Sequence, residues 1–169
     1  MVAFKNVEKI FRLIRGTTRG MDEHMMGNKM KEKGMRFEER VATMLSNRLE
    51  ANIKRNVTLI DKRGNRSEID IVYGIFFKTY VECKDYSVPV PLKDVAKFKE
   101  VLRLNNIGIG RGLFIASGDY VPRAKFVDIK LLDGDQLRRQ EILAPFIGII
   151  KFASYLSLTL SGYLFMIFG

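Results

Sequence analysis

The stretch Ser-Glu-Ile-Asp-Ile-Val-Tyr-Gly-Ile-Phe-Phe-Lys-Thr-Tyr-Val-Glu-Cys-Lys-Asp, from Ser67 to Asp85, decides the fold. β-Branched and aromatic residues fill both of its halves, and a glycine separates them. Such runs, interrupted by glycine, are typical of neighbouring strands. The stretch therefore predicts two β-strands, Glu68 to Tyr73 and Ile75 to Lys84, joined at Gly74.

Alternation along these strands places the charged residues. Successive side chains of a strand point to opposite faces, so Glu82 and Lys84 share one face while Val81 and Cys83 point into the core. By the same rule Asp70 points opposite to its two isoleucine neighbours. If the strands pair antiparallel, Asp70 comes near Glu82 and Lys84. Two carboxylates and one ammonium would then meet on one side of the sheet, which is a site for Mg²⁺.

These residues resemble a known nuclease core. An acid in Ile69-Asp70-Ile71-Val72, followed by Val81-Glu82-Cys83-Lys84, is similar to the PD-(D/E)XK nuclease superfamily and its Mrr-like restriction endonuclease branch. Upstream, residues 34–39 resemble the first helix of that family, and downstream residues 127–137 resemble its closing strand and helix. The resemblance covers Lys33 to Gln140. It implies an α/β fold with a restriction-endonuclease-like central mixed β-sheet flanked by helices.

The resemblance also implies a Mg²⁺-dependent DNA endonuclease, in which Mn²⁺ can replace Mg²⁺. Asp70 and Glu82 would bind the ion, and the backbone carbonyl of Cys83 would add a third ligand. Lys84 would orient or deprotonate the attacking water, or stabilise the charge that develops on the phosphate.

Two further glutamates leave alternatives open. Glu38, in the predicted first helix, would help to organise the metal through water; the alternative is a surface glutamate paired with a basic residue. Glu68 lies two residues before Asp70 and could replace it as a ligand, although Asp70 matches the family pattern. Without a cation, clustered carboxylates repel one another, which supports a metal site.

Composition limits the partners. The chain has 169 residues, which suits one domain and an accessory segment, and a net charge of +10. That charge favours nucleic acid or an anionic membrane surface, or else is a solvated surface without a specific partner. A single cysteine excludes an internal disulfide framework, and the lack of a Cys/His cluster argues against structural zinc. His24 is the single histidine of the sequence, and no catalytic role is predicted for it.

Residues 1–33 form a basic amphipathic N-terminal segment and a linker. Basic and apolar residues alternate at helical spacing over residues 1–20, which predicts a surface or docking helix or an organelle transit peptide. Gly16, Gly20 and Gly27 are expected to break any helix, so residues 17–33 are predicted as a linker.

Residues 34–141 form the predicted nuclease domain. Its other elements are a helix 34–51, a strand 52–60, a charged turn 61–66, a loop 85–91, a helix 92–104, a glycine-rich turn 105–112, a strand 113–116, a short helix 123–127, a strand 129–132 and a helical turn 136–141.

Candidate contacts with DNA lie in two of these elements. Lys62, Arg63 and Arg66 surround the turn before the acidic strand, where they could contact a phosphate backbone or serve solubility alone. Lys93 and Lys97 lie on the helix 92–104 and are expected to face the substrate.

Residues 142–169 change in character and are predicted to be a hydrophobic transmembrane segment. Residues 152–169 carry no charge, and about 18 or more such residues can span a bilayer. Basic residues precede the segment, which places the nuclease domain on the cytoplasmic side. The alternative is a pair of buried helices.

The sequence therefore predicts a membrane-anchored, Mg²⁺-dependent endonuclease with DNA as substrate. One alternative is a catalytically inactive, membrane-anchored nucleic-acid-binding module. Another is a junction-resolving or repair nuclease with the same site. A homodimer is compatible with the sequence, as is organelle targeting.

Overall fold

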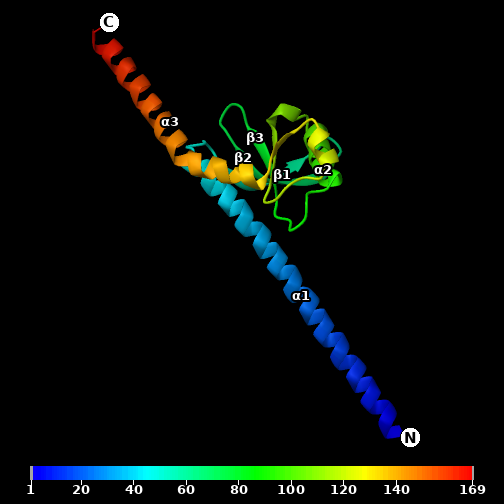
Figure 1. Cartoon of the computed structure of the whole chain (residues 1–169). Coiled ribbons are helices and arrows are strands. Elements are labelled where there is room, and N and C mark those ends of the chain that lie inside the picture. The colour runs from blue at the N-terminus through cyan, green and yellow to red at the C-terminus, as the bar shows by residue number, and fades with distance from the viewer. Residues whose placement is uncertain (1, 169) are drawn as a thin grey trace. The chain divides into compact units, whose positions relative to one another are not determined.

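The structure, a computed structural model, describes the backbone of residues 2–168 and the side chains of residues 25–163, 166 and 167. The chain divides into two compact units, residues 1–36 and 37–169. The elements, coloured along the chain in Figure 1, are α1 (Val2–Asn47), β1 (Lys54–Ile60), β2 (Arg66–Tyr73), β3 (Thr79–Lys84), α2 (Leu92–Leu104), η1 (Ile109–Arg111), β4 (Gly112–Ala116), η2 (Pro122–Phe126), β5 (Lys130–Leu132) and α3 (Gly134–Phe168).

The first unit is helical throughout its described length. The expectation that glycines break the helix over residues 17–33 is wrong, because α1 continues through Gly16, Gly20 and Gly27. A single glycine costs a helix only about 1 kcal/mol, and the methionine, lysine and glutamate residues between these glycines favour helix. The side chains of residues 2–24, which include the basic amphipathic pattern and His24, lie outside the described residues.

The second unit contains a mixed five-stranded sheet in the order β1-β2-β3-β4-β5. β1, β2 and β3 pair antiparallel, whereas β3, β4 and β5 pair parallel. A parallel neighbour requires a crossover connection, which α2 provides between β3 and β4. The predicted central mixed sheet and the predicted bounds of α2 are confirmed.

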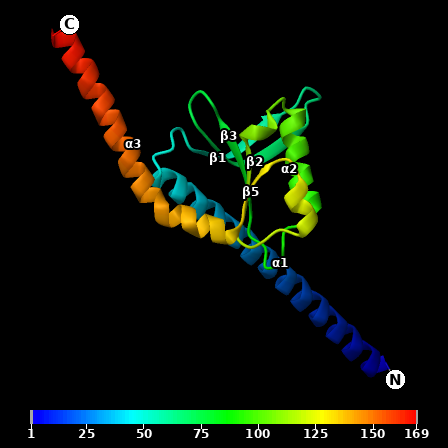
Figure 2. The same cartoon turned by 45° about the horizontal axis from the view of Figure 1, so that its top comes forward.

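Helices cover both faces of this sheet, as Figure 2 shows for α2 and α3. On one face Val41 and Leu137 pack against Ile115. On the other face Phe98 of α2 packs against Phe114, with ring centroids 5.9 Å apart. The sheet is therefore the middle layer of a three-layer domain, and α2 lies over the face to which Glu82 and Lys84 point.

The hairpin between β2 and β3 is longer than expected. β3 begins at Thr79 rather than Ile75, and pairing ends at Tyr73 opposite Thr79. Gly74 has a φ of +100°, a conformation that turns the chain away from the strand path. Residues 75–77 follow as an exposed loop, because no helix covers them. Because these residues are apolar, the sequence pattern wrongly predicted that the strand begins at Ile75.

α3 joins two segments that were expected to be separate. It is one helix from the predicted turn 136–141 through the predicted hydrophobic segment 142–169, as far as Phe168, with Pro145 inside. Its first half contacts the C-terminal part of α1, where Arg40 pairs with Glu141 at 2.6 Å. From residue 152 to 163 every side chain is exposed, so the alternative of buried helices does not describe this stretch.

By length and composition, residues 134–163 of α3 are the one described segment that could cross a membrane.

Candidate functional site

The candidate site lies where β2 and β3 separate, which we call the strand fork. The two strands pair at Ile71 opposite Val81, and this register would place Asp70 opposite Glu82. The backbone ladder stops there instead. The backbone N–H of Cys83 donates to Oδ2 of Asp70 at 2.6 Å, so a carboxylate takes the place of a strand carbonyl. The predicted antiparallel pairing thus brings Asp70 and Glu82 together.

An irregularity in β1 lies opposite the point where Asp70 turns into the fork. Asn56 occupies the position opposite Asp70 and has a φ of +51°, which interrupts the pleat. Ile69 then packs with the α2 face and Ile71 with the α1 and α3 face. The expectation that both isoleucines share a face opposite Asp70 is wrong. Asp70 therefore lies between a residue that packs on one face of the sheet and a residue that packs on the other.

Glu82 and Lys84 follow the predicted alternation, with Val81 and Cys83 buried between helices and sheet. Lys84 Nζ lies 2.6 Å from Glu82 Oε1, and only 29% and 17% of these two side chains are exposed. An ion pair screened from water to this extent is held in one geometry more firmly than a surface pair.

A cleft of about 500 Å³ opens from the fork toward α2. Six predicted residues line it: Asp70, Glu82, Lys84, Glu68, Arg66 and Lys97. The other predicted residues, Glu38, Cys83, Lys62, Arg63 and Lys93, do not line it. The cleft therefore combines the acidic fork with cations from β2 and α2.

The carboxyl groups of the fork hold protons more tightly than free carboxyl groups. Burial raises the pKa of Asp70, and Glu68 adds to the effect, although the Cys83 N–H and Lys84 oppose it. Burial, and next the charge of Asp70, raise the pKa of Glu82. Folding therefore becomes less favourable as pH rises from the ordinary carboxyl pKa through these raised values. A bound cation would offset this cost.

Lys84 carries a proton in this environment. Burial lowers the pKa of its amine, but the charges of Glu82 and Asp70 outweigh burial and raise the pKa above its usual value. The side chain is therefore an ammonium at neutral pH. This favours a role in stabilising negative charge over a role as the base that deprotonates water.

Glu38 lies between two partners. Its Oε2 is 3.5 Å from Nη2 of Arg55, which also pairs with Glu39. Burial, and then the charge of Asp70, raise the pKa of Glu38. The ion pair of the alternative interpretation is therefore present, although it is partly buried, and Glu38 also lies within electrostatic range of the fork.

Cys83 contributes through its backbone. Its side chain belongs to the core cluster on the α1 and α3 face. The N–H and C=O groups of one strand residue point to the same side, so the carbonyl faces the fork as its N–H does. The thiol is therefore buried in the core, and the role of the carbonyl as a metal ligand stays a prediction.

Three polar residues that line the cleft, Ser67, Tyr86 and Asp94, were not predicted from the sequence. Tyr86 donates a hydrogen bond to Oδ2 of Asp94, with the oxygens 2.9 Å apart. Tyr86 stands two residues after Lys84, so alternation continued past the strand end would have suggested it. Asp94 lies in the first turn of α2 and gave no such signal.

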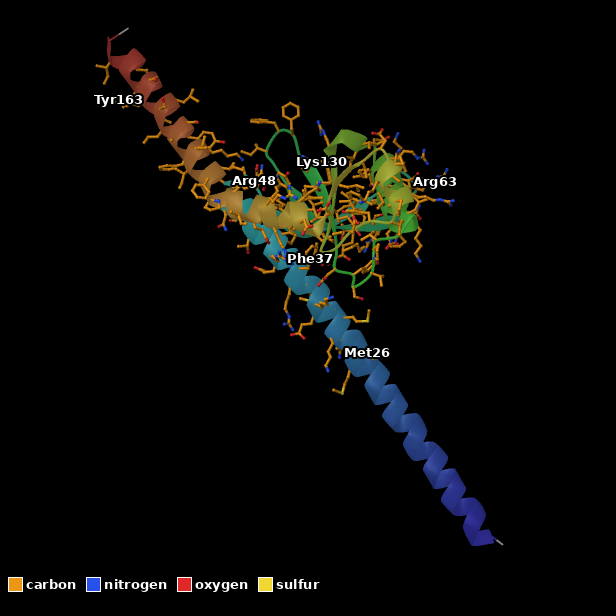
Figure 3. All side chains as sticks on the ribbon, viewed as in Figure 1. Met26, Phe37, Arg48, Arg63, Lys130 and Tyr163 are labelled. Atoms are coloured by element: carbon orange, nitrogen blue, oxygen red, sulfur yellow. The ribbon has the colours of Figure 1, made fainter. Side chains whose placement is uncertain are left out.

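The basic turn lies apart from α3. Asp61 accepts hydrogen bonds from the backbone N–H groups of Arg63 and Asn65, which fixes the turn and leaves Lys62 and Arg63 exposed. Figure 3 shows Arg63 and Tyr163 far apart on the second unit.

The donor set fits a hard divalent cation. No group of three or more Asp, Glu, His or Cys side chains among the described residues is arranged to hold a metal. Mg²⁺ nevertheless keeps several waters and is commonly bound by one or two carboxylates. Asp70 and Glu82, on neighbouring strands beside the backbone of Cys83, meet that requirement.

Comparison with protein families gives a match that covers most of the chain. The model Mrr_cat, described as a restriction endonuclease, matches residues 29–140. The matched range contains the strand fork and nearly coincides with the predicted resemblance. Comparison with curated proteins gives no match.

Solved structures show similar folds at low identity. AF1548, a protein of unknown function, aligns at 19% identity over 62% of this chain, with a TM-score of 0.49. VC1899 from Vibrio cholerae aligns at 14% identity over 66% of this chain, with a TM-score of 0.43. The DNA modification-dependent restriction endonuclease AspBHI aligns at 14% identity over 77% of this chain, with a TM-score of 0.44. The alignments cover 66%, 32% and 37% of those chains, less than two thirds of each.

Proposed function

Because this chain belongs to the restriction endonuclease family matched by residues 29–140, we propose that it cleaves DNA with a divalent cation while α3 tethers it to a membrane. The observation that supports cleavage is the strand fork, in which Asp70 and Glu82 face each other beside an ammonium inside a cleft. Buried like charges cost free energy, so a binding surface alone has no need of them.

Asp70, Glu82 and the Cys83 carbonyl would hold the cation. When bound, it would supply a water of lowered pKa and neutralise charge on the phosphate. Lys84 would hold its proton and face the phosphate oxygens as they gain charge. Glu38, beyond the cleft lining, would influence the fork through its charge and through water.

DNA would be held by the cations around the cleft. Arg66 and Lys97 line it and would contact phosphates beside the fork. Lys62 and Arg63 extend this surface along the β1–β2 turn, and Lys93 extends it along α2. Phosphate contacts position the duplex without reading its sequence, so these residues are expected to set affinity.

A plasmid nicking assay tests the proposal. The full chain should nick supercoiled DNA with Mg²⁺ or Mn²⁺ and not in EDTA. If it binds DNA but never nicks it with either cation, the inactive binding module is the correct function.

The tether is supported by the exposed half of α3. Side chains from Phe152 to Tyr163 are exposed and uncharged, and Lys151 at their start pairs with Glu50 at 2.7 Å. Arg138, Arg139 and Lys151 lie on the N-terminal side of this stretch, which is consistent with a cytoplasmic domain.

A chain that ends at Lys151 should move from the membrane fraction to the soluble fraction and still nick DNA. The cut must not be made at Ile142, because Ala144 is buried in the core and Lys151 pairs with Glu50. Sedimentation after cell lysis measures the change, and a chain with Lys151→Met but α3 intact is the control. A full-length protein that is already soluble without detergent would contradict the tether.

A further inference from the structure

The loop between β2 and β3 exposes three consecutive large apolar residues. Ile75, Phe76 and Phe77 are 62%, 87% and 81% exposed. Single exposed apolar residues are ordinary on a protein surface, but three together at the tip of a hairpin indicate a contact site. None of the three takes part in the core clusters of the described residues.

The loop is held in shape at its base. Gly74 has a φ of +100°, and a Cβ there would lie 2.5 Å from the backbone oxygen of Phe77. The N–H of Gly74 donates to the carbonyl of Ala51 at 2.7 Å. Arg111 lies over the ring of Phe77, 5.7 Å from its centroid. The apolar side chains are thus presented outward by a defined backbone.

The base of this loop lies beside the point where α3 leaves the core. Ala51, which accepts from Gly74, directly follows Glu50, and Glu50 binds Lys151 at 2.7 Å. Lys151 directly precedes the exposed apolar stretch of α3. Figures 1 and 2 both show the loop, drawn in green, on the α3 side of the domain. Both apolar surfaces therefore belong to the second unit, and the contacts of Glu50 and Ala51 join their bases.

We propose that the loop Gly74–Lys78 inserts into the bilayer that holds α3, as a second membrane contact. This proposal rests on the proposed tether. Aromatic rings favour the membrane interface, and cations beside them favour anionic headgroups. Phe76 and Phe77 supply the rings, and Lys78 and Arg111 supply the cations. The lipid surface would be anionic.

A lipid partner suits the loop better than DNA does. Aromatic side chains also stack on unpaired bases, so a nucleic-acid contact must be weighed. The loop contributes no residue to the cleft, however, and the candidate phosphate contacts lie on the β1–β2 turn and α2. Continuity with α3 favours the membrane.

A single-tryptophan experiment tests the insertion, because the chain contains no tryptophan. The full-length variant Phe76→Trp is reconstituted in vesicles of phosphatidylcholine and phosphatidylserine with brominated acyl chains. Phe126→Trp is the matched control, since Phe126 is also 87% exposed but lies on η2. Leu158→Trp reports on α3 in the same vesicles.

The emission of Phe76→Trp should fall about twofold or more relative to unbrominated vesicles, and that of Phe126→Trp should not change. If only Leu158→Trp is quenched, the tether is correct and the loop insertion is wrong. If neither Phe76→Trp nor Leu158→Trp is quenched, the tether fails as well. Equal quenching of Phe126→Trp, or a response of Phe76→Trp to DNA instead of bromine, would also overturn the insertion.

Discussion

The Asp70→Asn protein should bind DNA as tightly as the wild type and nick it about a thousandfold more slowly with Mg²⁺. A carboxylate that helps to hold the cation supports both water activation and charge relief, and each 1.36 kcal/mol of lost transition-state stabilisation is a factor of ten. Rates of plasmid nicking at saturating DNA, together with filter binding, measure the two effects.

Asparagine is a better substitution than alanine at this position. The oxygen of Asp70 accepts the N–H of Cys83, and alanine would leave that buried donor without a partner. An amide oxygen can still accept it. Loss of activity in Asp70→Asn would then report on charge rather than on folding.

Asp119→Asn is the matched control. Asp119 also accepts a backbone N–H, from Tyr120 at 2.7 Å, and pairs with a lysine, Lys125 at 2.9 Å. It lies outside the cleft at the fork, so its variant should nick DNA at the wild-type rate. Nicking by Asp70→Asn at a rate close to that of Asp119→Asn would remove Asp70 from the site.

Replacing Lys84 with methionine or with arginine separates the effect of its charge from the effect of its basicity on the nicking rate. Lys84→Met should slow nicking by about 100-fold to 1,000-fold, as expected when a group that stabilises developing charge is lost. Lys84→Arg should remain at least about tenfold faster than Lys84→Met, because arginine keeps the charge but cannot act as a base. Single-turnover nicking rates measure the difference.

The raised pKa of Lys84 is the reason for this expectation, since Glu82 and Asp70 keep its amine protonated. The opposite role, in which Lys84 acts as the base, predicts a different result. If Lys84→Arg is as slow as Lys84→Met, and the wild-type rate keeps rising into alkaline pH, Lys84 deprotonates the attacking water.

The sequence predicted the parts of the fold that follow from local periodicity. The bounds of α2 follow from its apolar spacing after Pro91, and the alternation of β3 places Glu82 and Lys84 on one face. The antiparallel pairing of β2 with β3 follows from their short connection. These three features suffice to bring the acidic residues together.

Other features depend on contacts that no local pattern records. Ile69 and Ile71 pack on different faces, and the positive φ of Asn56 that accompanies this change lies on another strand. The exposed residues around Phe76 have the composition of a strand, but no described strand pairs with them and no described helix covers them. The unbroken α1 shows that isolated glycines do not by themselves end a helix.

The most direct measurement is anomalous scattering from crystals of the full-length protein soaked with Mn²⁺. The proposed function predicts a single strong peak in the strand fork, within coordination distance of Asp70 and Glu82, that is lost in Asp70→Asn crystals. An empty fork in a protein that nicks DNA with Mn²⁺, or a peak that persists in Asp70→Asn, would contradict it.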